Sequence, residues 1–167
     1  MINRIADFEK VSFEQYKMDC LTLYKTNPDE EALHKEWEEI KLPVRATGDS
    51  CGYDFFIPRN MYINGRPKVL ATGIRTHIDS GWFLMCAPKS GLGFKYEARL
   101  ANTIGIVDGD YYYSDNEGHI LIKLSSETSF DLEAGNKFVQ GIFLPYGITK
   151  DDHATAKRNG GFGSTGA

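Results

Sequence analysis

Apolar side chains before residue 42 recur at the three- and four-residue spacing of helices rather than at the alternating spacing of strands. Two sets of apolar residues each share one face of a predicted helix: Phe13, Tyr16 and Cys20, and then Leu33, Trp37 and Ile40. We therefore predict two short helices in this region. Their apolar faces are expected to pack, either on the main domain of the same chain or on a partner protein.

The predicted helix starts carry recognisable capping residues. Ser12 is followed three positions later by Gln15, which is the spacing of a capping box. Residues 27–30 read Asn-Pro-Asp-Glu and offer a second start, with proline where a helix tolerates the loss of a backbone N–H. Leu42 and Pro43 end the helical region, because the residue before a proline is disfavoured in a helix.

The chain from Val44 onward alternates between short apolar runs and turn residues. The predicted strands cover residues 52–57, 69–77, 82–87, 104–107, 120–124 and 138–144. Many short strands separated by regular turns favour an all-β sandwich, jelly roll or barrel over a fold built from βαβ units. After Pro145 the apolar pattern fades, which indicates an arm without a core of its own.

These patterns divide the chain into three parts. A length of 167 residues suits one domain that buries a real core, and the chain holds no internal repeat. We expect a helical extension over residues 1–42, a β domain over residues 43–147, and a flexible arm over residues 148–167.

Composition narrows the class of protein. A formal net charge of −4 argues against a general nucleic-acid binder, which would carry a basic face. Cys20, Cys51 and Cys86 are widely spaced and odd in number, so neither a disulfide framework nor a zinc site is expected. No signal peptide or membrane span is predicted, and the cytoplasm is the expected location.

Residues 102–111 read Asn-Thr-Ile-Gly-Ile-Val-Asp-Gly-Asp-Tyr and place acidic and aromatic groups where an apolar run meets a glycine turn. Asp108 is expected at the rim of the core, with Gly109 bending the chain and Tyr111 returning to the same rim. A carboxylate there is ionised at neutral pH and can take a proton from water. The residues alone leave open that Asp108 is only a turn residue, because Asp-Gly is a common hairpin signal.

Residues 88–93, Pro-Lys-Ser-Gly-Leu-Gly, leave a predicted strand with a cation, a hydroxyl and bare backbone amides close together. Such a turn can cradle a phosphate, since glycine allows close approach and neighbouring N–H groups bind anions. The spacing of a Walker A loop is absent. An ordinary turn is the alternative.

Two further segments offer weaker signals. Arg158 and Phe162 lie in a glycine-rich stretch that is either a linker or an arm able to fold over a nucleotide. Asp54 precedes an apolar strand and is either structural or a metal ligand, directly or through water. The histidines show no ligand spacing, so a histidine-bound metal is not expected: His34, His77, His119 and His153.

Taken in order, five segments resemble the five motifs of the trimeric deoxyuridine triphosphatases (dUTPases). The segments are residues 52–54, 88–92, 102–111, 135–143 and 158–166. The resemblance implies a mainly β fold, the dUTPase-like jelly roll or clip barrel. It also implies a homotrimer whose three sites each use more than one subunit and are closed by the C-terminal arm.

The resemblance also implies roles for single residues. Asp108 would be the general base that activates water, Asn102 would read uracil, and Tyr111 would lie against deoxyribose. Substrate contacts are further expected from Lys89, Ser90, Gly91, Gly105, Val107, Gln140, Arg158, Phe162, Gly163 and Ser164. Asp54 would reach Mg²⁺ through water, with the metal held mainly by the triphosphate.

The implied activity is hydrolysis of dUTP to dUMP and pyrophosphate, which limits uracil incorporation into DNA and supplies dUMP for thymidylate synthesis. Two alternatives stand beside it. A dUTPase-fold regulatory protein would use the nucleotide site as a switch and the N-terminal helices as a partner surface. A dCTP deaminase shares the fold.

The chain departs from the family pattern at four places, one of which is the helical segment before Lys41, which has no counterpart in the compact family members. Lys89 stands where many relatives carry arginine, Gly141 replaces a larger apolar residue, and residues 112–118 are expected to form a bulkier hairpin.

Overall fold

The structure of this protein is a computed structural model that describes residues 3–25, 29–156 and 158. The strands are β1 (Ala6–Lys10), β2 (Val44–Arg45), β3 (Tyr53–Phe56), β4 (Met61–Ile63), β5 (Lys68–Ala71), β6 (Ile74–Ile78), β7 (Trp82–Pro88), β8 (Arg99–Leu100), β9 (Gly105–Val107), β10 (Leu121–Ser125), β11 (Phe130–Leu132) and β12 (Lys137–Pro145). The helices are α1 (Phe13–Tyr24), α2 (Glu30–Glu39), α3 (Ser90–Tyr96) and the 3-10 helix η1 (Gly109–Tyr113).

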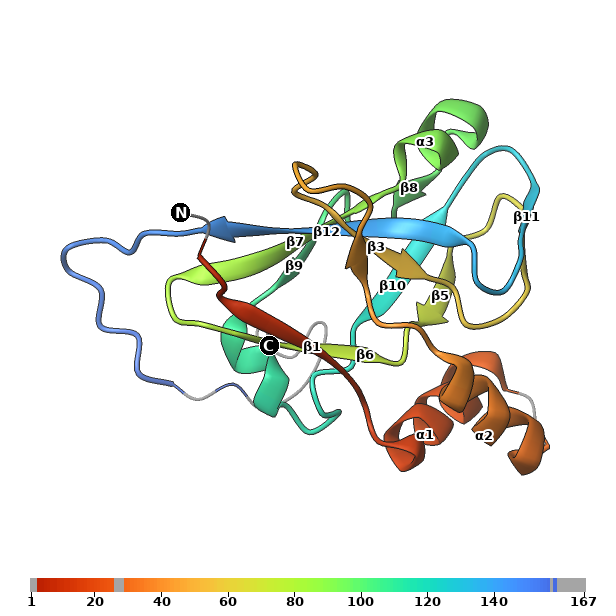
Figure 1. Ribbon diagram of the computed structural model, residues 1–167, viewed down its shortest axis with the longest axis horizontal. Helices are drawn as coiled ribbons and strands as arrows, with labels where there is room; N and C mark the ends of the chain where they lie inside the picture. Colours follow the sequence, from red (N-terminus) through yellow and green to blue (C-terminus); the bar gives the residue numbers. More distant parts are fainter. Residues whose placement is uncertain (1–2, 26–28, 157, 159–167) are drawn as a thin grey trace.

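The strands form four antiparallel sheets. The largest has the order β2-β3-β12-β7-β9, with the long strand β12 at its centre, and a second has the order β5-β10-β8. The pairs β1-β6 and β11-β4 complete the arrangement. The molecule is therefore mainly β, and the predicted fold class is confirmed (Figure 1).

One apolar core joins the sheets. Its fully buried side chains come from all four of them and from the first helix: Tyr16, Phe55, Ile63, Leu70, Ile74, Leu84, Leu124 and Phe138. In β6 the buried positions alternate with half-buried ones, as expected for a strand with one face on the core.

Both predicted N-terminal helices are present. The hydroxyl of Ser12 accepts a hydrogen bond from the amide of Gln15, so Ser12 caps α1 as predicted. The capping box is incomplete, because the Gln15 side chain donates to Asp19 and the Ser12 amide donates to Glu117. The second start was placed wrongly, because α2 begins at Glu30 and its cap is Asp29, whose carboxylate accepts from the amide of Glu31. The cap is Asp29 since its short carboxylate reaches the second amide of the first turn. Asn27 and Pro28 lie outside the described residues.

The two helices pack on their own chain at one end of the molecule (Figure 1). Cys20, Leu33 and Ile40 are buried, and Ile40 lies directly against Gly73. Glu36 of α2 binds Arg59 of the β domain at 2.6 Å. The apolar faces of the helices are thus covered within the chain.

The strand prediction differs from the structure at several places, and the short strands β2, β4, β8 and β11 were not predicted. Residues 69–77 form two strands, because Gly73 adopts a φ of +71° and turns the chain between β5 and β6. Strand β1 was not predicted, since its sequence Ala-Asp-Phe-Glu-Lys holds few apolar residues. It forms by pairing with β6 along its whole length, a non-local contact.

Two predicted turns contain helices. Residues 90–96 form α3, so the segment after β7 is a helix start rather than a simple turn. The hairpin expected over residues 112–118 is absent, because residues 109–113 form η1 and two turns follow, closed by the amides of Glu117 and His119. Tyr112 is held there by Glu9 and Arg75, which lie on β1 and β6.

The three cysteines are free thiols, as expected. Burial raises the pKa of the Cys20 thiol to about 11 and that of Cys86 to about 12, so neither is a thiolate at neutral pH. Within the described part of the chain, no helix is long and apolar enough to span a membrane.

Packing explains why glycine occupies position 141, and this explanation gives a first prediction. A Cβ at this position would lie 2.8 Å from Leu84 Cδ1 and 3.0 Å from Phe55 Cε2, so the two larger side chains occupy the space. We expect Gly141→Val to lower the free energy of unfolding by about 1–3 kcal/mol through overpacking. Chemical denaturation would measure this.

The double variant Gly141→Val, Leu84→Ala is the control. Because valine then fills part of the space left by Leu84, the double variant should lose less free energy of unfolding than the two single variants lose in sum. Additive costs would contradict this packing account.

Candidate active site

A buried carboxylate lies between two lysines at one end of the large sheet. Asp54 of β3 is 2% exposed, its Oδ1 lies 2.7 Å from Lys89 Nζ, and its Oδ2 lies 2.8 Å from Lys137 Nζ. Burial disfavours the charged form, but the hydrogen bonds from both lysines outweigh it and lower the pKa of Asp54 below its usual value. Asp54 is therefore a fixed anion that holds the two ammonium groups in place.

Strand register brings other predicted residues to this same end. Asp54 pairs with Gln140 of β12, and Gln140 pairs with Ala87 of β7, two residues before Lys89. Gly52 leaves room for the Gln140 amide, since a Cβ there would lie 3.0 Å from Gln140 Oε1. We call Asp54, Lys89, Lys137 and Gln140, together with the start of α3, the lysine end of the sheet.

The start of α3 adds backbone donors to the lysine end. Ser90 and Gly91 are exposed and lie in the first turn, where N–H groups have no partner within the helix. A hydroxyl, these amides and two ammonium groups are a donor set suited to phosphate oxygens.

Asn102 lies at the tip of a tight turn between β8 and β9, which belong to different sheets. The amide of Thr103 donates to the carbonyl of Leu100, and Thr103 has a φ of +69°. Asn102 is exposed at this tip, whereas Gly105 and Val107 of β9 are buried beside β7. The turn thus leaves Asn102 and its neighbouring backbone exposed at the surface.

Asp108 follows β9 directly and immediately precedes η1. Its carboxylate is 54% exposed and accepts a hydrogen bond from Arg158 at 2.7 Å, while Asp110 lies 3.4 Å from the same guanidinium nitrogen. The Arg158 guanidinium also lies 5.0 Å from the centre of the Tyr111 ring. Asp108, Tyr111 and Arg158 are therefore brought together in one chain.

Tyr111 is held in place by burial and by a hydrogen bond of its hydroxyl. Its ring is 2% exposed, and its hydroxyl donates to the carbonyl of His119 at 2.7 Å. Burial raises the pKa of the Tyr111 phenol, so the hydroxyl stays protonated and acts as a donor.

The structure does not bring the lysine end and Asp108 together within one chain. Val107 pairs with Leu84, near the start of β7, whereas Lys89 follows the other end of that strand. At about 3.3 Å per residue, Asp108 and Lys89 are separated by roughly 20 Å along β7. One chain alone thus holds two halves of the predicted site.

The residues around Asp54 do not fit a bound cation. Both oxygens already bind ammonium groups, which repel Mg²⁺ and favour an anion. Over residues 3–25, 29–156 and 158 there is no cluster of three or more His, Cys, Asp or Glu side chains suited to a metal. The link between Asp54 and Mg²⁺ stays a prediction.

Three predicted site residues lie outside the part of the chain that the structure describes, and some residues near the site were not predicted. Phe162, Gly163 and Ser164 lie outside the described residues. Lys137 and Asp110 were not predicted as site residues, although both lie inside segments that carry the motif resemblance. His119 gave no signal, because its partners are distant in sequence.

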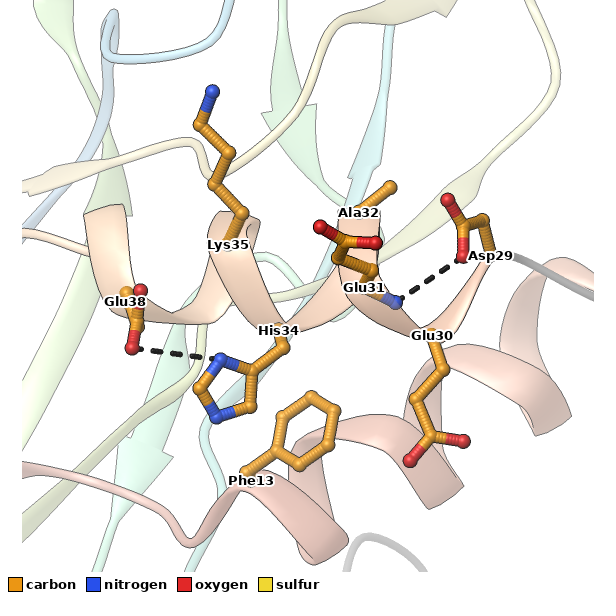
Figure 2. A pocket seen from close by; sticks show the side chains of 8 residues that line it. All are labelled: Phe13, Asp29, Glu30, Glu31, Ala32, His34, Lys35 and Glu38. Atoms are coloured by element: carbon orange, nitrogen blue, oxygen red, sulfur yellow. Dashed lines mark hydrogen bonds and ion pairs between the residues drawn. The ribbon is translucent and has the colours of Figure 1, made fainter.

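A surface pocket along α2 lies apart from all these residues. Figure 2 shows its lining side chains, which are Phe13, Asp29, Glu30, Glu31, Ala32, His34, Lys35 and Glu38. None of them is a predicted site residue, so this pocket is not part of the candidate active site.

Comparisons with known proteins agree with the order of the motifs. The dUTPase family model matches residues 38–166. The deoxyuridine 5'-triphosphate nucleotidohydrolase of Lactococcus lactis is 35% identical over 134 residues, which cover 77% of this chain and 89% of the relative.

Two solved structures are similar in fold. The dUTPase from Streptococcus mutans matches with a TM-score of 0.61 and 33% identity, covering 65% of this chain and 88% of that one. A mutant dUTPase from phage phi11 of S. aureus, described as coordinating a structural Mg(II) ion, matches with a TM-score of 0.59. It is 15% identical, with 71% of this chain and 92% of that chain covered, so it shows likeness of fold alone.

The contacts of Asp54 generate a second prediction. We expect Asp54→Asn to lower the free energy of unfolding by roughly 2–3 kcal/mol at pH 7, since two ammonium groups lose their counter-ion. The folded pKa of Asp54 lies below the unfolded value of about 4, so its stabilisation is present above that pH. It is lost as the pH falls through the lowered folded pKa.

Urea denaturation of both proteins at pH 7 and at pH 3 tests this. The difference between wild type and variant should shrink at the lower pH. A difference that does not change with pH would show that the ion pairs do not stabilise the fold.

Proposed function

This chain belongs to the dUTPase family, and on that premise we propose that it hydrolyses dUTP to dUMP and pyrophosphate. The observation that carries the proposal is the exposed carboxylate of Asp108, held at the end of β9 beside Tyr111 and Arg158. Such a carboxylate can orient a water molecule and take its proton as the water attacks the α-phosphorus.

Arg158 has two roles in this proposal. Without substrate its guanidinium pairs with Asp108. When the triphosphate arrives, phosphate oxygens replace the carboxylate as its partner, because a guanidinium binds phosphate through several parallel hydrogen bonds. This exchange frees Asp108 to act as a base and places a positive charge where the leaving pyrophosphate develops negative charge.

The lysine end binds the phosphate chain. Lys89, Ser90, Gly91 and Gln140 provide two kinds of donor, point charges and directed N–H or O–H groups, and Lys137 adds a further charge. Asp54 serves to hold the two lysines rather than to touch substrate. Mg²⁺ would enter with the triphosphate, whose oxygens are its preferred ligands, and would neutralise part of its charge.

In this proposal, the turn at Asn102 selects the base and Tyr111 selects the sugar. Asn102 would read the polar edge of uracil together with the backbone at Gly105 and Val107. Tyr111 would lie against deoxyribose and leave no space for a 2′-hydroxyl. Phe162, Gly163 and Ser164 would close over the nucleotide from the C-terminal arm.

We propose that the active unit is a homotrimer. The separation between the lysine end and Asp108 along β7 supports this, because a second copy can supply the missing half of each site. In a cell, the reaction would take place in the cytoplasm, limit uracil incorporation into DNA and supply dUMP.

Asp108→Asn tests the proposed base. The amide keeps the size of the side chain but cannot accept a proton from water, so turnover of dUTP should fall by at least about 100-fold while binding is retained. Pyrophosphate release and equilibrium binding of dUTP would be measured together. Asp110→Asn is the matched control, since Asp110 shares the Arg158 contact at 3.4 Å, and it should keep most of the activity. Near-normal turnover by Asp108→Asn would refute its role.

Subunit mixing tests the shared site. Asp108→Asn subunits and subunits carrying both Ser90→Ala and Gln140→Ala should each be inactive alone. Refolded together, they should regain about a quarter of wild-type activity, because random pairing restores some complete sites. No recovery in mixed oligomers would mean that each site is built within one chain.

A further inference from the structure

The segment that follows Asp108 is tied to the N-terminal extension at three separate points. Residues 109–119 carry no strand of their own, so these contacts, together with those to β6, hold them in place. The contacts join Tyr112 Oη to Glu9 Oε2 at 2.9 Å, Ser12 N and Oγ to the Glu117 carboxylate at 2.7 Å each, and His119 Nδ1 to Asp19 Oδ2 at 2.6 Å. The extension thus braces the segment that holds Tyr111.

The deepest of the three contacts is that of His119, whose side chain is fully buried. Its Nε2 accepts a hydrogen bond of 2.8 Å from the amide of Gly73. An imidazole that accepts at Nε2 is neutral and carries its proton on Nδ1, which faces Asp19. The ring is therefore held on both sides, by the backbone between β5 and β6 and by helix α1.

Asp19 is itself well positioned for this contact. Its side chain is 18% exposed, and the same Oδ2 atom that meets His119 also accepts a hydrogen bond from Gln15 at 2.8 Å. One carboxylate oxygen thus joins α1 to the buried ring. Without it, the Nδ1 proton of His119 would be buried without an acceptor, which is costly enough to make the ring move.

Movement of His119 would reach Tyr111. The backbone carbonyl of His119 accepts the hydrogen bond of the Tyr111 hydroxyl, and Asn116 Nδ2 donates to that hydroxyl at 2.8 Å. Tyr111 in turn lies under the Arg158 guanidinium. A continuous series of contacts therefore runs from α1 through His119 to the side chain that would face the sugar.

We propose that Asp19 is a positioning residue for dUTP selection, acting through His119 on Tyr111. This rests on the proposed function and extends it to the N-terminal helices, which act as a brace for the site. Because a site rejects an added hydroxyl only when its wall is held firmly, loss of the brace affects the choice between dUTP and UTP more than it affects turnover of dUTP.

The experiment compares kcat and KM for dUTP and for UTP in the full-length chain. Asp19→Ala should lower the ratio of kcat/KM for dUTP over UTP by about tenfold, mainly by lowering KM for UTP, because a loosened wall admits the 2′-hydroxyl. Asp19→Asn should restore the ratio, since its amide oxygen can accept from both His119 and Gln15.

Glu36→Gln is the matched control. Glu36 is 21% exposed and joins the extension to Arg59 at 2.6 Å, so its exposure and ion-pair length resemble those of Asp19, but it does not contact residues 109–119. The variant should lower the melting temperature without changing the preference for dUTP. An equal loss of preference in Glu36→Gln would show that only general stability matters, and would overturn the proposal.

Amide hydrogen exchange gives a readout that does not need activity. Peptides covering residues 109–119 should exchange about tenfold faster in Asp19→Ala than in wild type, with little change in β12. If Asp19→Ala does not fold, Glu117→Ala removes a second contact of the same segment and should change exchange and preference in the same direction. Unchanged preference in the folded variants would overturn the proposal.

The experiments distinguish a failure of the proposed function from a failure of the role proposed for Asp19. If the wild-type protein does not hydrolyse dUTP, the proposed function is wrong and the role of Asp19 falls with it. If the wild type prefers dUTP over UTP and Asp19→Ala keeps that preference, only the role of Asp19 is wrong.

Discussion

The antiparallel pairing of β7 with β9 determines which site residues one chain can bring together. Because β9 runs back along β7, the residue that leaves β9 emerges near the start of β7, while Lys89 emerges at its end. The donors proposed to bind phosphate and the proposed base are consequently held at opposite ends of the same sheet. This constraint makes a site shared between subunits the simplest arrangement that unites them.

Each half of the site is held by its own buried polar contact. At one end Asp54 fixes two lysines, and at the other His119 fixes the carbonyl that holds Tyr111. In both cases the group that we propose faces the substrate is held by a neighbouring polar group. The N-terminal helices matter for this reason, since α1 supplies the acceptor for His119.

Local signals in the sequence predicted local structure well. The cap at Ser12 and the strands around Leu84 and Phe138 depend on neighbouring residues, and the structure contains them. Contacts between distant residues were not predictable from one sequence. Strand β1 exists because it pairs with β6, and Lys137 joins the site because its side chain reaches Asp54 from a position opposite Phe56. The same holds for His119, whose partners come from α1 and from the turn at Gly73.

The central claim, hydrolysis of dUTP by this site, is tested most directly by pyrophosphate release measured in parallel for dUTP, dCTP, dTTP and UTP with Mg²⁺, with ammonia release followed for dCTP. We predict that pyrophosphate is released from dUTP far faster than from the other three nucleotides and that dCTP gives no ammonia. Equal rates on all four nucleotides, or ammonia from dCTP, would contradict it.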